Sequence, residues 1–234
     1  MLRILFWNCQ GLANPSTMSS LRLLVCKYRP VLIGISEPKT NSSNAGISLN
    51  RNGYSLLSSV QESPYLDRLC IFFHHSVRNP SIVRLDDQIL TCSFLHSGQL
   101  SYCSFIYAHN SYICRRPLWI TINELSNSIV EPWVLMGDFN AILNKDEKLG
   151  LASSAISMRE FRACVEESNL IEFKLIGAKY TWYKKHLSGM RASRIDCTFG
   201  NESLLGCWKT ISCITLAKHN PDHHPILTTF IDKE

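Results

Sequence analysis

Short apolar runs that end in polar residues recur along the chain and predict buried strands. Residues 2–6 form one such run, and residues 31–35 repeat the pattern after Pro30. Between them, apolar residues from Met18 to Tyr28 fall at helical spacing, so the first part of the chain predicts strand, helix, strand. Asn8 and Glu37 follow the two strands. They are therefore expected at the carboxyl edge of a sheet, where α/β proteins usually bind ligands.

The rest of the chain alternates between strand and helix patterns. Residues 40–98 hold short apolar segments separated by Asn, Ser, Pro and Gly, which predict an antiparallel meander. One helix is expected to open at Pro117 and another at a capping box, Ser157-Met158-Arg159-Glu160. Further strands are predicted at residues 102–107, 133–136, 180–183, 194–199, 210–216 and 226–231. This mixture predicts one domain over residues 1–234, an α/β four-layer sandwich of two packed mixed sheets with helices outside.

Composition narrows the class of protein. A chain of 234 residues with 45% apolar residues can bury a full core, and it holds no apolar run approaching the roughly 20 residues that span a bilayer. We expect a soluble monomer that contacts no membrane and is not secreted. The ten cysteines are scattered singly, with no CxxC pair, which predicts buried reduced thiols and no zinc site. A net charge of +5 favours a polyanionic partner only slightly.

Six polar clusters lie at or just beyond predicted strands. They span residues 7–11, 36–39, 107–110, 137–140, 194–196 and 222–225. Hydrolysis of a phosphate ester requires neutralised phosphate charge, an activated water and a stabilised leaving oxygen. Carboxylates for a hard divalent cation, a His, and neutral amide or phenol donors meet those needs.

Each cluster also has a purely structural interpretation. Glu37 alone is more often a solvated carboxylate, and Asp138 followed by Asn140 is more often a self-capping loop. Asp196 beside Arg194 fits a surface ion pair, and Tyr107 fits a core tyrosine with its hydroxyl at the rim. The structural interpretation has to be repeated for every cluster, whereas one phosphodiesterase site accounts for all of them.

Taken in chain order, the clusters resemble the signature of the endonuclease/exonuclease/phosphatase superfamily. Gly137-Asp138-Phe139-Asn140 and Asp222-His223-x-Pro225 are the most diagnostic pieces, and Trp7-Asn8-Cys9-Gln10-Gly11-Leu12 looks like plant LINE (non-LTR) retrotransposons. The resemblance runs from Leu5 to Phe230, although residues 40–98 carry no matching motif. It implies a deoxyribonuclease-like sandwich and a Mg²⁺-dependent endonuclease that nicks DNA, with Mn²⁺ as a substitute cofactor.

The resemblance also implies a role for each site residue. Metal ligands would be Glu37, with Asn8 nearby and Asp222 facing the metal region. His223 would be the essential His, held by Asp196, while Asp138 orients or deprotonates the attacking water. Tyr107, Asn110 and Asn140, with Asn8, would donate hydrogen bonds to the scissile phosphate. A carboxylate behind a His fixes its tautomer and raises its basicity, so these roles are chemically coherent. Whether Asp138 or His223 is the base stays open.

Several positions near the clusters bear on substrate and metal. Trp182 could stack on a base of DNA, and Lys184 and Lys185 could contact its phosphates. A Trp182 buried in the core beside two solvated lysines is an equally good interpretation. Gln10 stands where many relatives place a second acid, which predicts weaker metal binding. Pro221 replaces a common Ser and lacks an amide donor. His109 replaces a common Pro.

Three functions therefore remain open from the sequence. The first is a metal-dependent DNA endonuclease derived from a LINE element, which would act in the nucleus, or otherwise in the cytoplasm. The second is a phosphatase or phosphodiesterase that uses the same core on lipids or small molecules. The third is a decayed nucleic-acid-binding remnant. LINE endonucleases are normally followed by a reverse transcriptase, and we expect none in this chain.

Overall fold

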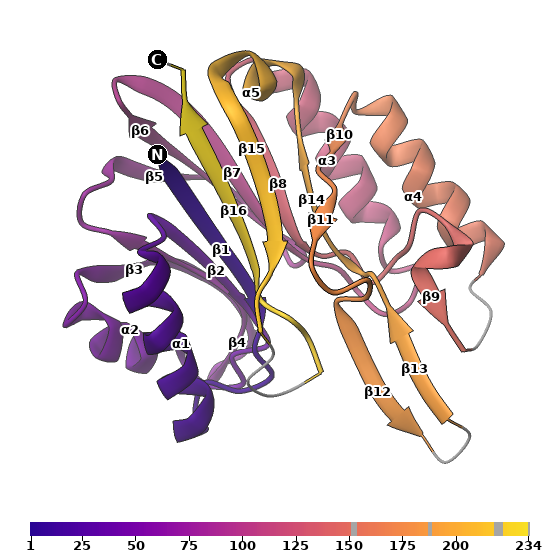
Figure 1. Ribbon diagram of the computed structural model, residues 1–234, viewed down its shortest axis with the longest axis horizontal. Coiled ribbons are helices and arrows are strands. Elements are labelled where there is room, and N and C mark those ends of the chain that lie inside the picture. The colour runs from indigo at the N-terminus through magenta and orange to yellow at the C-terminus, as the bar shows by residue number, and fades with distance from the viewer. Residues whose placement is uncertain (151–153, 187–188, 218–221, 234) are drawn as a thin grey trace.

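Two mixed β-sheets pack face to face in the computed structural model, which describes residues 1–150, 154–186, 189–217 and 222–233 (Figure 1). The first sheet has the strand order β11-β15-β16-β1-β2-β4-β3. Its members are β1 (Leu2–Asn8), β2 (Leu32–Ser36), β3 (Tyr54–Ser63), β4 (Leu66–His74), β11 (Leu175–Ile176), β15 (Trp208–Thr215) and β16 (Ile226–Asp232).

The second sheet has the order β10-β14-β8-β7-β6-β5. Its members are β5 (Arg78–Leu85), β6 (Ile89–His96), β7 (Gln99–Tyr107), β8 (Trp133–Asp138), β10 (Ile171–Glu172) and β14 (Asp196–Gly200). A third sheet, here called the hairpin sheet, contains β12 (Trp182–His186), β13 (Gly189–Ser193) and β9 (Lys148–Leu149). The β12–β13 hairpin projects from the lower end of the molecule in Figure 1.

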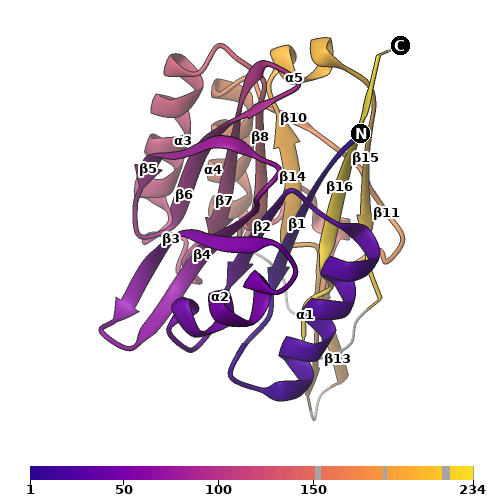
Figure 2. The same cartoon turned by 90° about the vertical axis from the view of Figure 1, so that its left-hand side faces the viewer.

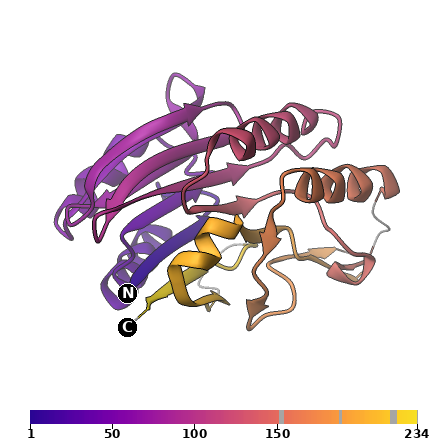
Figure 3. The same cartoon turned by 90° about the horizontal axis from the view of Figure 1, so that it is seen from above.

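Helices cover the outer faces of the two large sheets. The α-helices are α1 (Pro15–Tyr28), α2 (Ser42–Asn50), α3 (Arg116–Ser128), α4 (Ala155–Glu167) and α5 (Glu202–Cys207), and a 3₁₀ turn, η1, spans Lys145–Glu147. Figures 1 and 2 show α1 and α2 on one side of the molecule and α3 and α4 on the other. Seen from above, α3 and α4 run beside each other (Figure 3), and Trp119 stacks on Phe161 between them with ring centroids 5.1 Å apart.

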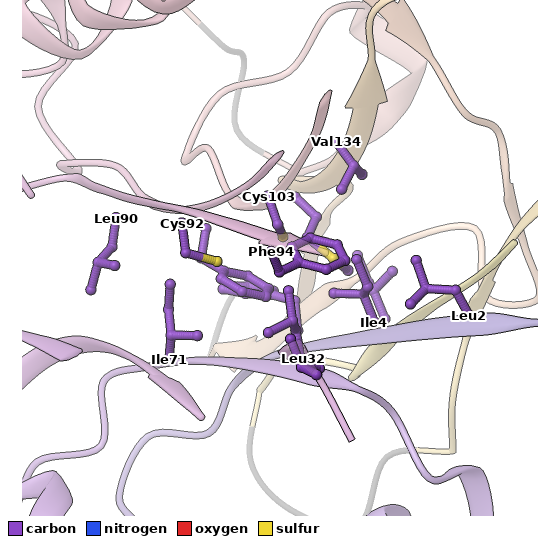
Figure 4. Close-up of a cluster of buried hydrophobic side chains, with 14 of the residues drawn as sticks. Leu2, Ile4, Leu32, Ile71, Leu90, Cys92, Phe94, Cys103 and Val134 are labelled. Carbon is purple, nitrogen blue, oxygen red and sulfur yellow. The ribbon is translucent and has the colours of Figure 1, made fainter. Parts of the chain in front are cut away.

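Alternation along each central strand explains the layers. In β1, Ile4 and Phe6 enter the core between the sheets, while Leu5 and Trp7 face the helix side. Successive side chains on a strand point to opposite faces, so a strand covered on both faces reads as a continuous apolar run. Figure 4 shows the core between the sheets, where residues from both sheets meet. These layers confirm the predicted four-layer α/β sandwich.

Packing between the sheets is close enough to require glycine at one position. A Cβ on Gly34 of β2 would lie 2.0 Å from the Phe105 ring of β7. Phe105 is fully buried, and burial of such a side chain contributes roughly 1.5–3 kcal/mol. Gly34 therefore lets β2 pack closely against the second sheet. This packing fixes the end of β2, which Glu37 directly follows.

Two sequence expectations about helices were wrong. Residues 42–50 form helix α2 instead of the first part of a meander, because the Asn41 side chain accepts from the Ser43 amide and Asp67 accepts from the Ser42 amide at 2.6 Å. Helix α4 begins three residues before the predicted capping box: its N-cap is Ser154, whose hydroxyl accepts from the Ser157 amide.

The expectation about the cysteines held in part. Seven cysteines are buried, but Cys26 and Cys114 are exposed and Cys207 is half-buried, and all ten are free thiols. Among the described residues, no helix is long and apolar enough to cross a membrane.

Candidate active site

Strand register brings five of the predicted site residues to one edge of the sandwich. In the second sheet, Asp138 ends β8 and is paired with Tyr107 at the end of β7 and with Asp196 at the start of β14. In the first sheet, Asn8 ends β1 and is paired with Ser36, directly before Glu37. The site therefore lies where the ends of strands from both sheets meet.

Unusual backbone conformations shape this edge. Glu37 and Asn140 have φ near +48° and +47°, in the left-handed region. Asn tolerates this region, but for Glu it is strained, at a cost of roughly 1–3 kcal/mol. Gly137 precedes Asp138 because a Cβ there would lie 2.2 Å from the Ile106 carbonyl oxygen of the neighbouring strand. The chain thus turns sharply just where the polar side chains begin.

His223, Asp196 and Asp138 form a buried row. The Nδ1 of His223 lies 2.9 Å from Asp196 Oδ2, and its Nε2 lies 3.9 Å from Asp138 Oδ2. All three side chains are at most 3% exposed. Burial lowers the pKa of His223, but the attraction of Asp196 and Asp138 outweighs it and raises the pKa above its usual value. Burial, reinforced by repulsion from Asp196, raises the pKa of Asp138.

Thr181 holds Asp196 in this row. Its hydroxyl oxygen accepts from the Asp196 amide at 3.0 Å and from the Ile195 amide at 3.2 Å. Sequence reasoning did not assign Thr181 a role, because a buried threonine beside a strand has no distinguishing pattern. Trp182 forms an isolated bridge with His223, so the strand that follows Thr181 also positions the histidine.

Asn8 links Glu37 to the buried row. Its Nδ2 donates to Glu37 Oε1 and to Asp138 Oδ2, both at 3.0 Å. Asn8 has no N–H left to donate, so its expected role as a phosphate donor is not met in this arrangement. Burial opposes ionisation of Glu37, but hydrogen bonds from Asn8 and Tyr107 and the charge of Lys39 outweigh it and lower the pKa of Glu37.

Tyr107 is held in place by Arg68, a residue that no sequence pattern selected. The Arg68 guanidinium lies over the Tyr107 ring at 4.5 Å, within the range of a cation–π contact. Burial raises the pKa of Tyr107, and the hydroxyl therefore stays a neutral donor. Near it, His109 contacts Asp87 at 2.7 Å through Nε2, which is the structural role of the residue that replaces a common proline.

The remaining predicted residues line a pocket beside these groups. The Asn140 backbone amide donates to Asp138 Oδ1 at 3.0 Å, and one N–H of its side chain donates to the Ala108 carbonyl. The other side-chain N–H has no acceptor among the residues that the structure describes. Asn110 and Asp222 line the same pocket, whose volume is about 380 Å³. All the predicted site residues thus lie in or against one pocket, whereas Pro221 falls outside the described residues.

The pocket also contains cations and an aromatic residue from the hairpin sheet. Lys148, Trp182, Lys184 and Arg191 line it together with Ser193 and Ile195. Of these, Trp182 and Lys184 were candidates from the sequence. Lys148 and Arg191 were not, because the pairing of β9 with β13 brings them together only in the folded chain.

The residues fit a divalent cation. Asn8 Oδ1 is buried and has no hydrogen-bond partner among the described residues, and an unpaired buried oxygen is costly unless a ligand satisfies it. Glu37, Asn8 and Asp222 would offer the oxygen ligands that a hard cation prefers. Gln10 also lines the pocket, where an acidic residue would bind the cation more strongly.

A second grouping of possible ligands lies in the buried row itself. Atoms of Asp138, Asp196 and His223 come within 4.8 Å of one another. However, Asp196 Oδ2 already faces His223 Nδ1, and Asp138 Oδ2 already accepts from Asn8. A cation would have to break both contacts, so this grouping suits proton transfer better than metal binding.

Comparison with known proteins gives the family. The Endonuclease/Exonuclease/phosphatase family profile matches residues 5–205, more than half of the chain. The chain belongs to this family. Members of the family are metal-dependent nucleases and phosphodiesterases, and the family match ends before His223. The place of His223 therefore follows from the geometry of the structure. No curated protein matches the chain.

Solved structures of the same family share the fold at low identity. The endonuclease domain of TRAS1, a telomere-specific non-LTR retrotransposon, is 13% identical with a TM-score of 0.74, over 98% of each chain. The 3′-5′ exonuclease NExo of Neisseria meningitidis is 16% identical with a TM-score of 0.76, over 98% of this chain and 100% of that one. An AP endonuclease of Archaeoglobus fulgidus is 14% identical with a TM-score of 0.76, over 98% of this chain and 99% of that one. At such identities, these likenesses show the fold alone.

Proposed function

We propose that this chain is a Mg²⁺-dependent endonuclease that nicks DNA. The observation that carries the proposal is the single pocket at which Asn8, Glu37, Asp138 and the Asp196–His223 pair meet. It combines oxygen ligands for a divalent cation with a buried proton-transfer pair, and hydrolysis of a phosphodiester needs both.

The reaction is derived from the chain's own residues. A bound cation would neutralise charge on the phosphate oxygens and on the leaving oxygen. The attacking water gives its proton to the Asp138–His223 pair as its oxygen bonds to phosphorus and the bond from phosphorus to the leaving oxygen breaks, while Asp196 holds His223 through Nδ1. The leaving oxygen takes a proton from solvent. The free N–H of Asn140 and the amide of Asn110 donate to phosphate oxygens at the pocket wall.

The lining of the pocket favours a nucleic acid over a lipid or an inositol. Three cations, Lys148, Lys184 and Arg191, and the ring of Trp182 line it beside the acidic groups. Cations and stacked aromatics are the groups that bind a nucleic-acid strand. The β12–β13 hairpin, which supplies Lys184 and Arg191, extends beyond the lower end of the sandwich in Figure 1, as a clamp on an extended substrate would.

Origin and location follow from the same proposal. The motif at residues 7–12 supports derivation from a LINE element, and a DNA substrate would require action in the nucleus. Among the solved structures of this fold, NExo bound to a product DNA hairpin and a TDP2 complexed with a single-strand DNA product contain DNA. These structures support DNA as the partner here.

A duplex oligonucleotide assay separates nuclease from phosphatase activity. The purified chain is incubated with Mg²⁺ and a duplex labelled in mid-strand, a duplex with a terminal 3′-phosphate, or p-nitrophenyl phosphate. We expect internal cleavage of the first substrate and little release of phosphate from the other two. Rapid phosphate release without internal cleavage would overturn the endonuclease and establish a phosphatase.

A further inference from the structure

A second, smaller pocket adjoins the candidate active site. Its volume is about 190 Å³, and Asn110, Asn140 and Lys148 line both pockets. At ~30 Å³ per water, it holds roughly six waters, or a phosphate group with part of a sugar. The shared residues place this pocket next to the groups proposed to hold the scissile phosphate.

Arg115 is a buried cation without an acidic partner at this pocket. It is 3% exposed, and its Nη1 donates to the His109 and Asn110 carbonyls while its Nη2 donates to the Ser157 hydroxyl. Its Nε is buried with no hydrogen-bond partner, and no carboxylate lies within 4.0 Å in the part of the chain that the structure describes. Guanidinium stays charged in proteins, and buried charges are normally paired. Asp138 and Glu160 attract the charge on Arg115 from farther away, so that charge is balanced without a direct ion pair and its Nε stays unpartnered.

The two pockets differ in their acidic lining: the larger one has both carboxylates and cations, and the smaller one has cations alone among the described residues. Glu37, Asp138 and Asp222 line the candidate active site, whereas the smaller pocket is lined by Arg115 and Lys148 and by no carboxylate among the described residues. Ser154, the N-cap of α4, also lines it, and the first turn of that helix has no acidic residue. The positive end of a helix dipole adds to the preference for an anion.

We propose that this pocket binds the phosphate next to the scissile phosphate on the same nucleic-acid strand, with Arg115 and Lys148 as its charged ligands. This inference rests on the endonuclease proposal, in which the substrate is a strand that carries a second phosphate beside the scissile one. Arg115 also fastens the loop at residues 109–110. If Arg115 served only to fasten this loop, the smaller pocket would not bind phosphate through it.

Anion binding is tested without catalysis. The probe is inorganic phosphate in EDTA, and its apparent affinity is measured by ³¹P NMR line broadening for the parent protein, Arg115→Met, Lys148→Met and Arg116→Met. Arg116 is the matched control, because it is exposed and paired with Glu160 outside the pocket. Charge-assisted hydrogen bonds contribute enough that Arg115→Met should weaken binding about tenfold or more. Lys148→Met should weaken it less, and Arg116→Met should leave it unchanged.

Three results would overturn the proposal that this pocket binds phosphate. They are a parent protein that does not bind phosphate, equal phosphate affinity in all variants, and a loss of affinity in Arg116→Met as large as that in Arg115→Met. If Arg115→Met does not fold, Lys148→Met decides, because Lys148 lies on β9 away from the loop that Arg115 fastens. Arg115→Lys should then recover part of the affinity. Full recovery of folding without recovery of phosphate binding would also contradict the proposal.

A second arm separates the source of the phosphate and the two proposals. Duplexes carry one neutral methylphosphonate at the linkage on either side of the cleaved bond. The parent protein should lose about tenfold in cleavage at one of these positions, whereas Arg115→Met should lose no more at that position than at the other. If the parent protein binds phosphate but does not nick the duplex, the endonuclease proposal is overturned, whereas the smaller pocket is still an anion-binding site. Nicking that is unaffected by either methylphosphonate would keep the endonuclease and overturn the proposal that the pocket binds a neighbouring strand phosphate.

Discussion

Replacement of Asp196 by Asn tests the buried row most selectively. Asp196 is fully buried, lies 2.9 Å from His223 Nδ1 and is absent from the pocket lining. Asn keeps the shape but removes the charge, and it allows His223 to adopt the wrong tautomer. A hydrogen bond to a charged partner contributes roughly 1.5–3 kcal/mol, which corresponds to roughly 10- to 150-fold in rate. We expect kcat to fall by that factor with little change in KM.

The assay is single-strand cleavage of a labelled duplex at saturating Mg²⁺, with kcat and KM measured for Asp196→Asn, His223→Ala and the double variant. The double variant should be little slower than His223→Ala alone, because the two residues act as one unit. Asp146→Asn, at an exposed position, is the matched control. If Asp196→Asn keeps its fold and a kcat within about threefold of the parent, His223 is not oriented by Asp196 during the reaction.

Three further predictions concern metal binding and stability. Glu37→Gln should raise the Mg²⁺ concentration for half-maximal activity about tenfold or more, because it removes an ionised oxygen ligand; an unchanged Mg²⁺ titration would exclude Glu37 as a ligand. Gly34→Ala should lower the free energy of unfolding in urea by about 1–3 kcal/mol, since its Cβ would meet Phe105 at 2.0 Å. Gly206→Ala is the control and should leave the free energy of unfolding nearly unchanged, because a Cβ there meets nothing within 4 Å. Ser154→Ala should cost about 0.5–2 kcal/mol through loss of the α4 cap, and retained stability would contradict that assignment.

Sequence reasoning predicted the large sheets well because their central strands are apolar on both faces. β1, β2 and β8 are buried along nearly their whole length, and the sequence shows them as continuous runs. Helix α2 was missed because its apolar face is short, with only Ala45 and Leu49 as buried apolar residues. Its start depends on Asp67, which is distant in sequence. A contact of that kind leaves no local pattern.

The same distinction applies to the site. Residues such as Asn8, Glu37 and Asp138 could be predicted because each lies at or just beyond a recognisable strand and because their order along the chain resembles the family's motifs. Arg68 and Thr181 could not, because their roles come from contacts across the fold. The Arg68 guanidinium lies over the Tyr107 ring at 4.5 Å, and the Thr181 hydroxyl accepts from the amides of Ile195 and Asp196 at the start of β14. Arg115 likewise shows its buried, unpartnered Nε only once its surroundings are known.

Nicking of supercoiled plasmid tests the central claim most directly. The purified parent chain is incubated with plasmid in Mg²⁺ and in EDTA, beside His223→Ala and Glu37→Gln proteins shown by circular dichroism to be folded. The account predicts open-circular product with the parent in Mg²⁺, none in EDTA, and a loss of nicking in both variants. No nicking by the parent in Mg²⁺ or Mn²⁺, or equal nicking by the His223→Ala protein, would contradict it.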